Sequence, residues 1–268
     1  GIYLQETDSV LIDAVPSVDV VQVNFNSTAP TVGDTALSDL ATTANGPIKL
    51  VTLNGTITAN EGSDADGSVI AHGTGDVLLQ SRETAEATAA DVVINASVTS
   101  TSGNIRIDSA DAVDQNATVS TGGSGTILVT AVSGIDMSTG GGQTTQTAGG
   151  NIRLTVSGEA DLVLGLVDAT SAGDVSLSAG GSITDGNGGG TVNVIADELK
   201  LVADSDGGGV GLIGNHENAD GTPRVNANAI DITVAEVAAS AAQGIYLQET
   251  DSVLIDAVPS VDVVQVNF

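Results

Sequence analysis

Gly150-Asn-Ile-Arg-Leu-Thr-Val156 and Gly173-Asp-Val-Ser-Leu-Ser-Ala179 share the pattern that decides the fold of this chain. Each stretch begins with Gly and a polar residue, after which apolar and polar residues alternate. Alternation with a period of two predicts a β-strand, because successive side chains of a strand point to opposite faces. Similar starts recur at intervals of 29, 28, 22, 25 and 23 residues, at Gly46, Gly75, Gly103, Gly125, Gly150 and Gly173.

A step of this length is typical of one coil of a β-solenoid, in which each turn contributes two or three short strands. Further strand-like stretches lie between the Gly starts, as in residues 92–96 and 192–196. Stacked coils form parallel sheets, and Gly suits a tight corner where a side chain would clash. The pattern therefore predicts an all-β parallel β-helix. About ten coils at roughly 4.8 Å each would extend one period by on the order of 50 Å.

A second, longer repeat surrounds the short one. Residues 1–25 read GIYLQETDSVLIDAVPSVDVVQVNF, and residues 244–268 repeat them without a change, at an offset of 243. We interpret residues 1–243 as one full tandem-repeat unit of continuous β-solenoid and residues 244–268 as the first coils of the next identical unit. Residues 1–25 should then stack on the coil of residues 230–243 of a preceding unit.

The competing fold is a string of β-sandwich modules, two per period, which also gives short strands at regular spacing. Six near-equivalent starts within about 150 residues are too frequent for domains of roughly 100 residues. The uneven intervals predict loops that project at residues 60–67, 138–149, 182–190 and 206–223. Two Ala-rich stretches, 85–90 and 234–243, fit either a helix or a strand with a turn.

The composition excludes several classes of protein. The chain has 34 Asp and Glu against 6 Lys and Arg, a formal net charge of -28, and no Cys. So acidic a surface repels nucleic acid and anionic membranes, and no apolar stretch is long enough to insert into a bilayer. The absence of Cys excludes a disulfide framework and Cys-based metal sites. With 1% aromatic residues, the core must be aliphatic.

Two Asp-x-Asp-Gly turns are candidate calcium sites. They contain Asp64 and Asp66, to which Glu61 could add a ligand, and Asp204 and Asp206. Alternate carboxylates in a Gly-bearing turn supply the hard oxygen ligands that Ca²⁺ prefers. Neither turn has the later Glu of an EF-hand loop or the G-G-x-G-x-D pattern of calcium-binding β-helices. The alternative is a solvated acidic turn with diffuse cation screening.

Other catalytic and metal-binding patterns are weak. His72 and His216 are the only two His, and with no Cys they do not suggest the three convergent ligands of a zinc site. The six cations look scattered, although Arg106 and Arg153 take the same outward place in their coils. A polysaccharide-degrading β-helix would need converging acids and aromatic platforms, and one period has a single Tyr and a single Phe. We therefore expect no enzymatic activity and no bound cofactor.

The coil starts at Gly150 and Gly173, together with Gly244-Ile-Tyr-Leu-Gln-Glu249, resemble repeats of giant filamentous-haemagglutinin-like bacterial adhesins. The resemblance covers most coils from residue 103 to residue 268 and is weaker over residues 26–60. It implies a right-handed parallel β-helix, export from a bacterium to the cell surface or beyond, and a role in adhesion or in a surface filament. It carries no functional residues that could be transferred to this chain.

These observations predict a structural repeat of a very long extracellular fibre or adhesin, a stiff stalk or filament shaft built by coil-on-coil stacking. A ligand- or carbohydrate-binding adhesin module is the alternative, and a polysaccharide-degrading enzyme comes third. The expected partners are adjacent repeats end to end, and neighbouring fibres of the same protein.

Overall fold

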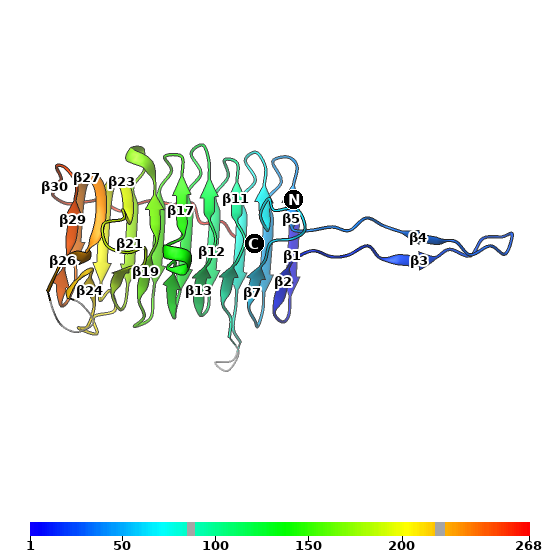
Figure 1. The fold of residues 1–268 in the computed structure, drawn as a ribbon, viewed down its shortest axis with the longest axis horizontal. Coiled ribbons are helices and arrows are strands. Elements are labelled where there is room, and N and C mark those ends of the chain that lie inside the picture. Colours follow the sequence, from blue (N-terminus) through cyan, green and yellow to red (C-terminus); the bar gives the residue numbers. More distant parts are fainter. Residues whose placement is uncertain (85–88, 218–222) are drawn as a thin grey trace.

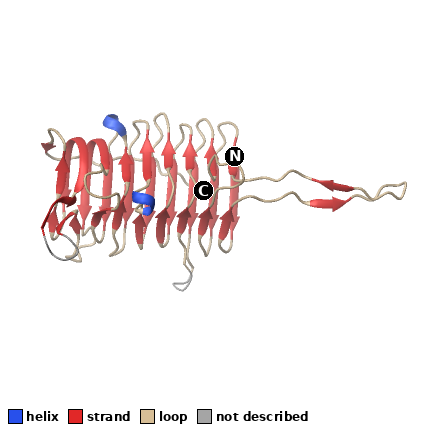
Figure 2. Cartoon of the chain, viewed as in Figure 1, coloured by secondary structure: helices blue, strands red, loops and turns tan. Residues whose placement is uncertain are grey.

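The computed structural model describes residues 1–84, 89–217 and 223–268 and is a parallel β-helix (Figures 1 and 2). The described part contains no α-helix, only the two short 3₁₀ turns η1 (Thr139–Gly141) and η2 (Thr170–Ala172). Each full coil contributes one strand to each of three faces, and strands of successive coils pair in parallel. The all-β parallel β-helix expected from the Gly starts is confirmed.

Three stacks of strands form the faces of the solenoid. Face 1 consists of β5 (Leu40–Thr42), β8 (Val69–Ala71), β11 (Val98–Ser100), β14 (Val119–Thr121), β17 (Thr144–Thr147), β20 (Leu166–Asp168), the first halves of β23 (Val194–Ala203) and β27 (Ile230–Ser240), and β29 (Leu247–Glu249). Face 2 consists of β1 (Ile2–Glu6), β6 (Ile48–Thr52), β9 (Val77–Ser81), β12 (Ile105–Ser109), β15 (Ile127–Ala131), β18 (Ile152–Val156), β21 (Val175–Ala179), the second halves of β23 and β27, and β30 (Leu254–Ile255). Face 3 consists of β2 (Val10–Ile12), β7 (Ile57–Ala59), β10 (Val92–Ile94), β13 (Ala112–Gln115), β16 (Gly134–Asp136), β19 (Leu162–Leu164), β22 (Ile183–Asp185), β24 (Leu212–Ile213) and β28 (Gly244–Ile245).

The core is a set of aliphatic ladders that run along the solenoid axis. In face 2 the coils stay in register, so that equivalent apolar residues lie directly above one another. One inward column is completely buried and consists of Ile48, Val77, Ile105, Ile127, Ile152, Val175 and Leu199. Burial of such columns drives folding, because a single coil cannot cover its own apolar side.

The Gly starts form a column at the corner between faces 1 and 2. A Cβ added to Gly103 would lie 2.2 Å from the carbonyl oxygen of Gly75, and one added to Gly150 would lie 1.9 Å from that of Gly125. Both approaches are too close for any side chain. Ser100, at the end of the preceding face 1 strand, donates from Oγ to the Gly75 carbonyl at 2.7 Å. The coil starts are therefore glycines because successive backbones nearly touch at this corner.

The expected loops are only partly right. Residues 60–67 connect two strands without forming one, but β17 and β22 lie within 138–149 and 182–190, where loops were expected. Strand β17 escaped notice because its inward positions are Thr145 and Thr147, both buried, instead of aliphatic residues. Within the expected loop 206–223 lies β25 (Asn215–Glu217), which pairs with β26 (Pro223–Asn228) in an antiparallel hairpin. Residues 218–222 lie outside the described part. Of the two Ala-rich stretches, residues 234–240 are strand, and residues 85–88 lie outside the described part.

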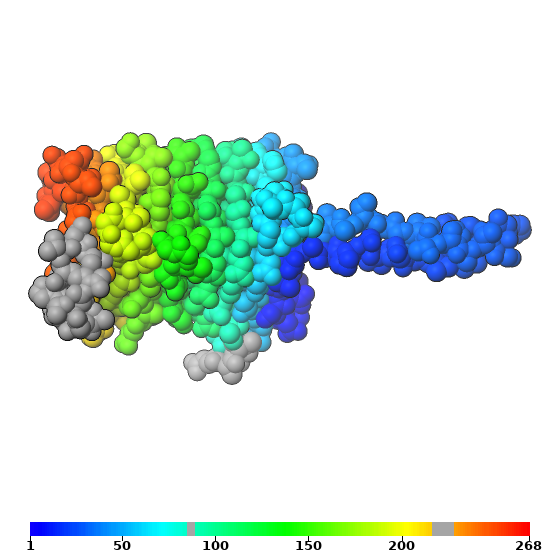
Figure 3. Space-filling view, viewed as in Figure 1, coloured from blue at the N-terminus to red at the C-terminus, as the bar shows by residue number. Residues whose placement is uncertain are grey.

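An arm that the sequence did not predict projects from the N-terminal end of the solenoid (Figures 1 and 3). It consists of residues 13–39 and contains an antiparallel pair of strands, β3 (Asp19–Val21) and β4 (Thr31–Gly33), which residues 22–30 connect at the tip. Its valines at positions 15, 18, 20, 21 and 23 are exposed. An isolated two-stranded hairpin is marginally stable in water, so the arm gains little stability from its own contacts.

The two identical 25-residue segments fold differently. In the first copy, residues 2–6 and 10–12 are the strands β1 and β2 on faces 2 and 3. In the second copy, β28, β29 and β30 lie on faces 3, 1 and 2. Strands β29 and β30 of the second copy stack on β27, which lies within residues 230–243, whereas β28 stacks on β24. Residues 256–268 then leave the coil as an extended tail.

Candidate functional site

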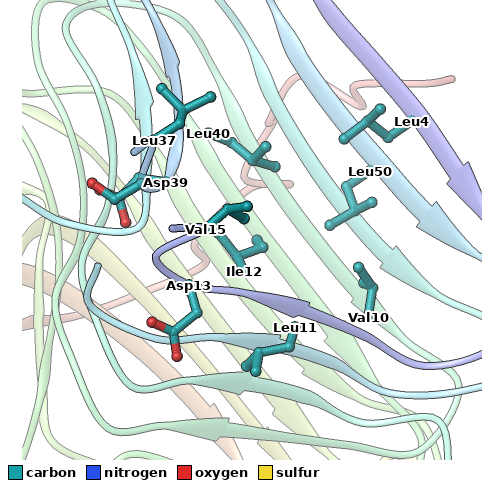
Figure 4. Close-up of a pocket in the computed structure, with 11 residues that line it drawn as sticks. Leu4, Val10, Leu11, Ile12, Asp13, Val15, Leu37, Asp39, Leu40 and Leu50 are labelled. Atoms are coloured by element: carbon teal, nitrogen blue, oxygen red, sulfur yellow. The ribbon is translucent and has the colours of Figure 1, made fainter. Parts of the chain in front are cut away.

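The N-terminal end of the solenoid exposes its own core. Strands β1, β2 and β5 pair with β6, β7 and β8 of the coils that follow them. A pocket of about 230 Å³ opens at this end (Figure 4). Its lining is mostly aliphatic and comes from the strands and from the base of the arm: Leu4, Val10, Leu11, Ile12, Asp13, Val15, Leu37, Ser38, Asp39, Leu40 and Leu50. An open apolar end of this kind is a surface on which a further coil could stack.

The C-terminal end is open in the same way. Leu254 and Ile255, the two residues of the last strand β30, are exposed, and Ile245 of β28 is partly exposed as well. Terminal repeats of solenoids normally carry a polar outer surface that keeps them soluble. Neither end of this solenoid has such a cap among the described residues.

The tail of residues 256–268 runs back along the outside of face 2 and ends beside the N-terminal coils (Figure 1). It crosses successive coils and is held mainly through its backbone. Asn151 Nδ2 donates to the Asp262 carbonyl at 2.9 Å, and Arg106 Nη1 donates to the Val266 carbonyl at 3.1 Å. Lys49 Nζ donates to the Asn267 carbonyl, and the Val264 N–H donates to Thr126 Oγ1 at 2.9 Å.

Apolar contacts reinforce these hydrogen bonds. Val266 packs with Val51 and Leu78 in a small buried cluster that is separate from the core. Val51 and Leu78 point outward from β6 and β9, so the tail covers two aliphatic side chains that face 2 would otherwise present to water. At the far end, the ring of Phe268 meets the ring of Tyr3 edge-on at 6.5 Å between centroids. We call the surface under the tail the face-2 channel, formed by Lys49, Val51, Leu78, Arg106, Thr126 and Asn151.

The cations, which look scattered in the sequence, are not scattered in the fold. Register pairing places Tyr3, Lys49, Leu78, Arg106, Leu128, Arg153, Ser176 and Lys200 in one outward column of face 2. This column carries four of the six Lys and Arg of a chain with net charge -28. Three of these cations, Lys49, Arg106 and Arg153, directly follow the sequence Gly-x-Ile, and this shared position is the feature of the sequence that indicates the column. Because Arg106 also pairs with Asp108 at 2.8 Å, its guanidinium is fixed beside the tail.

The acidic turn of Asp64 and Asp66 forms a cluster with two further carboxylates. Oxygens of Asp39, Glu61, Asp64 and Asp66 lie within 4.8 Å of one another. Asp39 comes from the base of the arm, 25 residues earlier in the chain than Asp64, which is why the sequence pattern found Glu61 and not Asp39. Burial, together with the nearby charges of Asp64 and Asp66, raises the pKa of Asp39. This arrangement offers four oxygen ligands of the kind that calcium takes.

The second acidic turn is different. Asp204 Oδ1 accepts the N–H of Gly209, and Asp206 Oδ1 accepts the N–H of Gly208 at 3.1 Å. The two carboxylates are thus used within their own turn, and in the part of the chain that the structure covers no third acidic or His side chain completes a metal-binding group with them. Of the two histidines, His72 is exposed and its Nδ1 contacts the Thr42 carbonyl, while His216 lies in β25.

Face 3 also concentrates negative charge. Asp114 and Asp136 are adjacent in register on β13 and β16, and both line a shallow depression with Asp161. Partial burial, followed by repulsion from Asp91 and Asp136, raises the pKa of Asp114. Neighbouring carboxylates on face 3 thus repel one another, whereas four of the six Lys and Arg side chains lie on face 2.

Comparisons of this chain with protein-family models, with curated proteins and with solved structures return no match. Within the described residues, no helix has the length and apolar character needed to cross a membrane. The functional argument therefore rests on the open ends, the face-2 channel and the acidic cluster.

Proposed function

We propose that this chain is a structural repeat of a long β-helical fibre, which acts as a stiff stalk or filament shaft and has no enzymatic role. The observation that carries the proposal is the uncapped N-terminal end, where aliphatic residues of β1, β2 and β5 line an open pocket. A coil stacked on this end would continue all three sheets and bury that surface. The identical segment at residues 244–268 supports this, because β29 and β30 stack on β27 at the opposite end.

Stiffness follows from the way in which the coils are joined. Ladder hydrogen bonds run parallel to the axis on all three faces, so bending the shaft would stretch many of them together. A side-chain ladder adds to them: Asn95 Nδ2 donates to Asn60 Oδ1, and Asn116 Nδ2 donates to Asn95 Oδ1, both at 2.9 Å. Asn60 donates in turn to Asp13 Oδ2 at 3.2 Å, so this ladder reaches the open end. An extracellular location on a bacterial surface is part of the proposal and rests on the adhesin resemblance alone.

The experiment is electron microscopy of chains that contain one, two and three 243-residue periods. Residues 1–243 contribute eight strands to face 3, so each added period should lengthen a rod of constant width by roughly 40 Å. Globular beads joined by hinges would refute the proposal and favour tandem sandwich modules.

The duplication supplies a matched control for the same experiment. Leu4 and Leu247 are equivalent residues, but Leu4 is exposed at the free end, whereas Leu247 packs against the core. In a two-period chain, Leu247→Asp should introduce a bend at the junction, and Leu4→Asp should leave the rod straight. Equal effects of the two substitutions would argue against a continuous core across the junction.

A further inference from the structure

The arm and the tail contain one sequence in two environments. Residues 14–25 of the arm are identical to residues 257–268 of the tail. The exposed fractions of three equivalent valines differ between the arm and the tail, as follows: Val15 59% and Val258 8%, Val18 58% and Val261 5%, Val23 79% and Val266 4%. The tail therefore shows what this sequence does when a surface is available to it, and the arm lacks that surface.

Three of the four backbone groups that the channel binds are ones that the arm leaves free; the fourth, the Asn267 carbonyl, is equivalent to the Asn24 carbonyl, which accepts from the Ser27 N–H within the arm. In the arm, Gln22 N–H donates to the Pro30 carbonyl at 3.0 Å, and the Val18 carbonyl accepts from Asp34 at 3.3 Å. Because hydrogen bonding alternates along an antiparallel pair, the groups of Asp19, Val21 and Val23 point to the opposite, unpaired edge. The channel binds the equivalent groups of the tail, namely those of Asp262, Val264 and Val266. The arm can therefore make these three contacts without breaking the hydrogen bonds between β3 and β4.

Direction and charge agree with this match. The arm projects beyond the N-terminal end along the solenoid axis (Figures 1 and 3), and the tail runs from the C-terminal end toward the N-terminal end (Figure 1). An arm at the start of one copy would thus lie along the side of the copy that precedes it. The arm carries Asp13, Asp19 and Asp34, whereas the channel lies on the column that holds Lys49 and Arg106. An acidic, valine-rich extended segment suits a channel with exposed aliphatic residues and cations.

We propose that the face-2 channel is the binding site for the arm of a second copy of this chain, and that the tail occupies it within one molecule. This inference goes beyond end-to-end stacking, since it assigns a lateral contact in which the arm fastens one copy to the side of its neighbour. In a single chain the tail is tethered beside the channel, so its effective concentration is high and it outcompetes a free arm. A second copy binds where the tail is absent or weakened.

The test uses the chain of residues 1–268 and changes the two identical segments separately. The tail variant carries Val258→Asp, Val261→Asp and Val266→Asp, which places three charges where buried valines were. The arm variant carries the same changes at the equivalent exposed positions, Val15→Asp, Val18→Asp and Val23→Asp, and a sixfold variant combines both sets. Light scattering after size exclusion reports the mass, and circular dichroism confirms that the β-helix is folded.

The wild type and the arm variant should have the same mass, because the tail fills the channel in both and the strands at the open ends are unchanged in every variant. The tail variant should have at least twice that mass, and its mass should rise with concentration, because each head-to-tail contact leaves one arm and one channel for a further copy. The sixfold variant should return to the wild-type mass. A folded tail variant that keeps the wild-type mass would overturn the proposal. So would a sixfold variant that associates as strongly, since that association would belong to the open ends and not to the arm.

A labelled peptide of residues 14–25 gives a second measurement that does not depend on self-association. It should saturate the tail variant at one site per chain and bind the wild type at least tenfold more weakly, because the tethered tail competes. A peptide with Val23→Asp should lose at least tenfold in affinity for the tail variant. Equal binding of both peptides would show that the channel does not recognise this sequence.

Discussion

The glycine column offers the sharpest test of the coil stacking. Gly150→Ala adds one methyl group at the corner between faces 1 and 2, where the new Cβ would lie 1.9 Å from the Gly125 carbonyl oxygen. Real Cβ contacts are not shorter than 3.0 Å, so the two coils must move apart by at least 1.1 Å. The hydrogen bond from Ile127 N–H to the Asn151 carbonyl, 3.0 Å long, joins these two coils and would be stretched beyond a useful length.

The magnitude follows from the groups that lose their partners. One or two buried backbone groups without hydrogen bonds cost about 1–3 kcal/mol each. The change from Gly to Ala returns about 0.4–1 kcal/mol by restricting the unfolded chain. We therefore expect Gly150→Ala to lower the free energy of unfolding by about 2–4 kcal/mol. In a chain of this size, that corresponds to a fall of roughly 5–15 °C in the unfolding midpoint.

The assay is thermal and urea unfolding followed by circular dichroism, with Gly208→Ala as the control. Gly208 lies in an exposed turn, where an added Cβ would meet its nearest neighbour at 3.5 Å. The control should leave the unfolding free energy unchanged or raise it by up to about 1 kcal/mol, because only the restriction of the unfolded chain acts there. If Gly150→Ala were as mild as Gly208→Ala, the close backbone approach at the corner would be wrong, and with it our explanation of the repeated Gly starts.

Three further predictions concern charge and the tail. Burial, with repulsion from neighbouring acids, raises the pKa values of Asp39 and Asp114, so the folded state binds protons more tightly than the unfolded chain. The unfolding midpoint should therefore rise as the pH falls from neutral toward the ordinary pKa of an Asp carboxyl group, and a flat profile over that range would contradict this. In chelator-treated buffer at neutral pH, Asp64→Asn should raise the midpoint by removing one of four clustered charges. If the cluster binds calcium, millimolar Ca²⁺ should raise the unfolding midpoint of the wild type more than that of this variant. Isothermal titration calorimetry measures the binding itself. Arg106→Ala removes the donor to the Val266 carbonyl, so hydrogen exchange of the amides of residues 257–268 should accelerate. Exchange of the β15 amides should not change. Unchanged exchange in the tail would show that Arg106 does not hold it.

Much of the shaft could be predicted from the sequence, because its determinants are local and periodic. The alternation after Gly103 and Gly150 specifies a strand with one buried side, and the Gly at each start specifies the corner. The prediction failed where a strand lacks this alternation of aliphatic and polar residues. Strand β17 uses buried threonines, and the arm has apolar residues on both sides, so that its valines gave no alternation to follow.

The candidate sites were harder to predict, because their residues are brought together by the register between coils. Asp64 and Asp66 lie two positions apart in one Asp-x-Asp-Gly turn, so the sequence showed them as a pair, but Asp39 joins them only because the arm returns to the coil beside them. Likewise, no spacing rule in the sequence places Lys49 above Tyr3 or brings Arg106 to the carbonyl of a residue 160 positions away. Those contacts are set by which strand stacks on which.

The duplicated segment shows separately what the local sequence determines and what the tertiary structure determines. The sequence by itself determined that residues 1–25 and 244–268 contain short strands with aliphatic side chains that must be covered. It could not determine which face each strand joins, because both copies have the same residues yet begin on faces 2 and 3 respectively. The neighbouring coil decides this, since ladder hydrogen bonds and inward columns can form only in register with strands already in place. The same physics leaves Val23 in water and buries Val266: an extended valine-rich segment has no fold of its own, and the available surface supplies one.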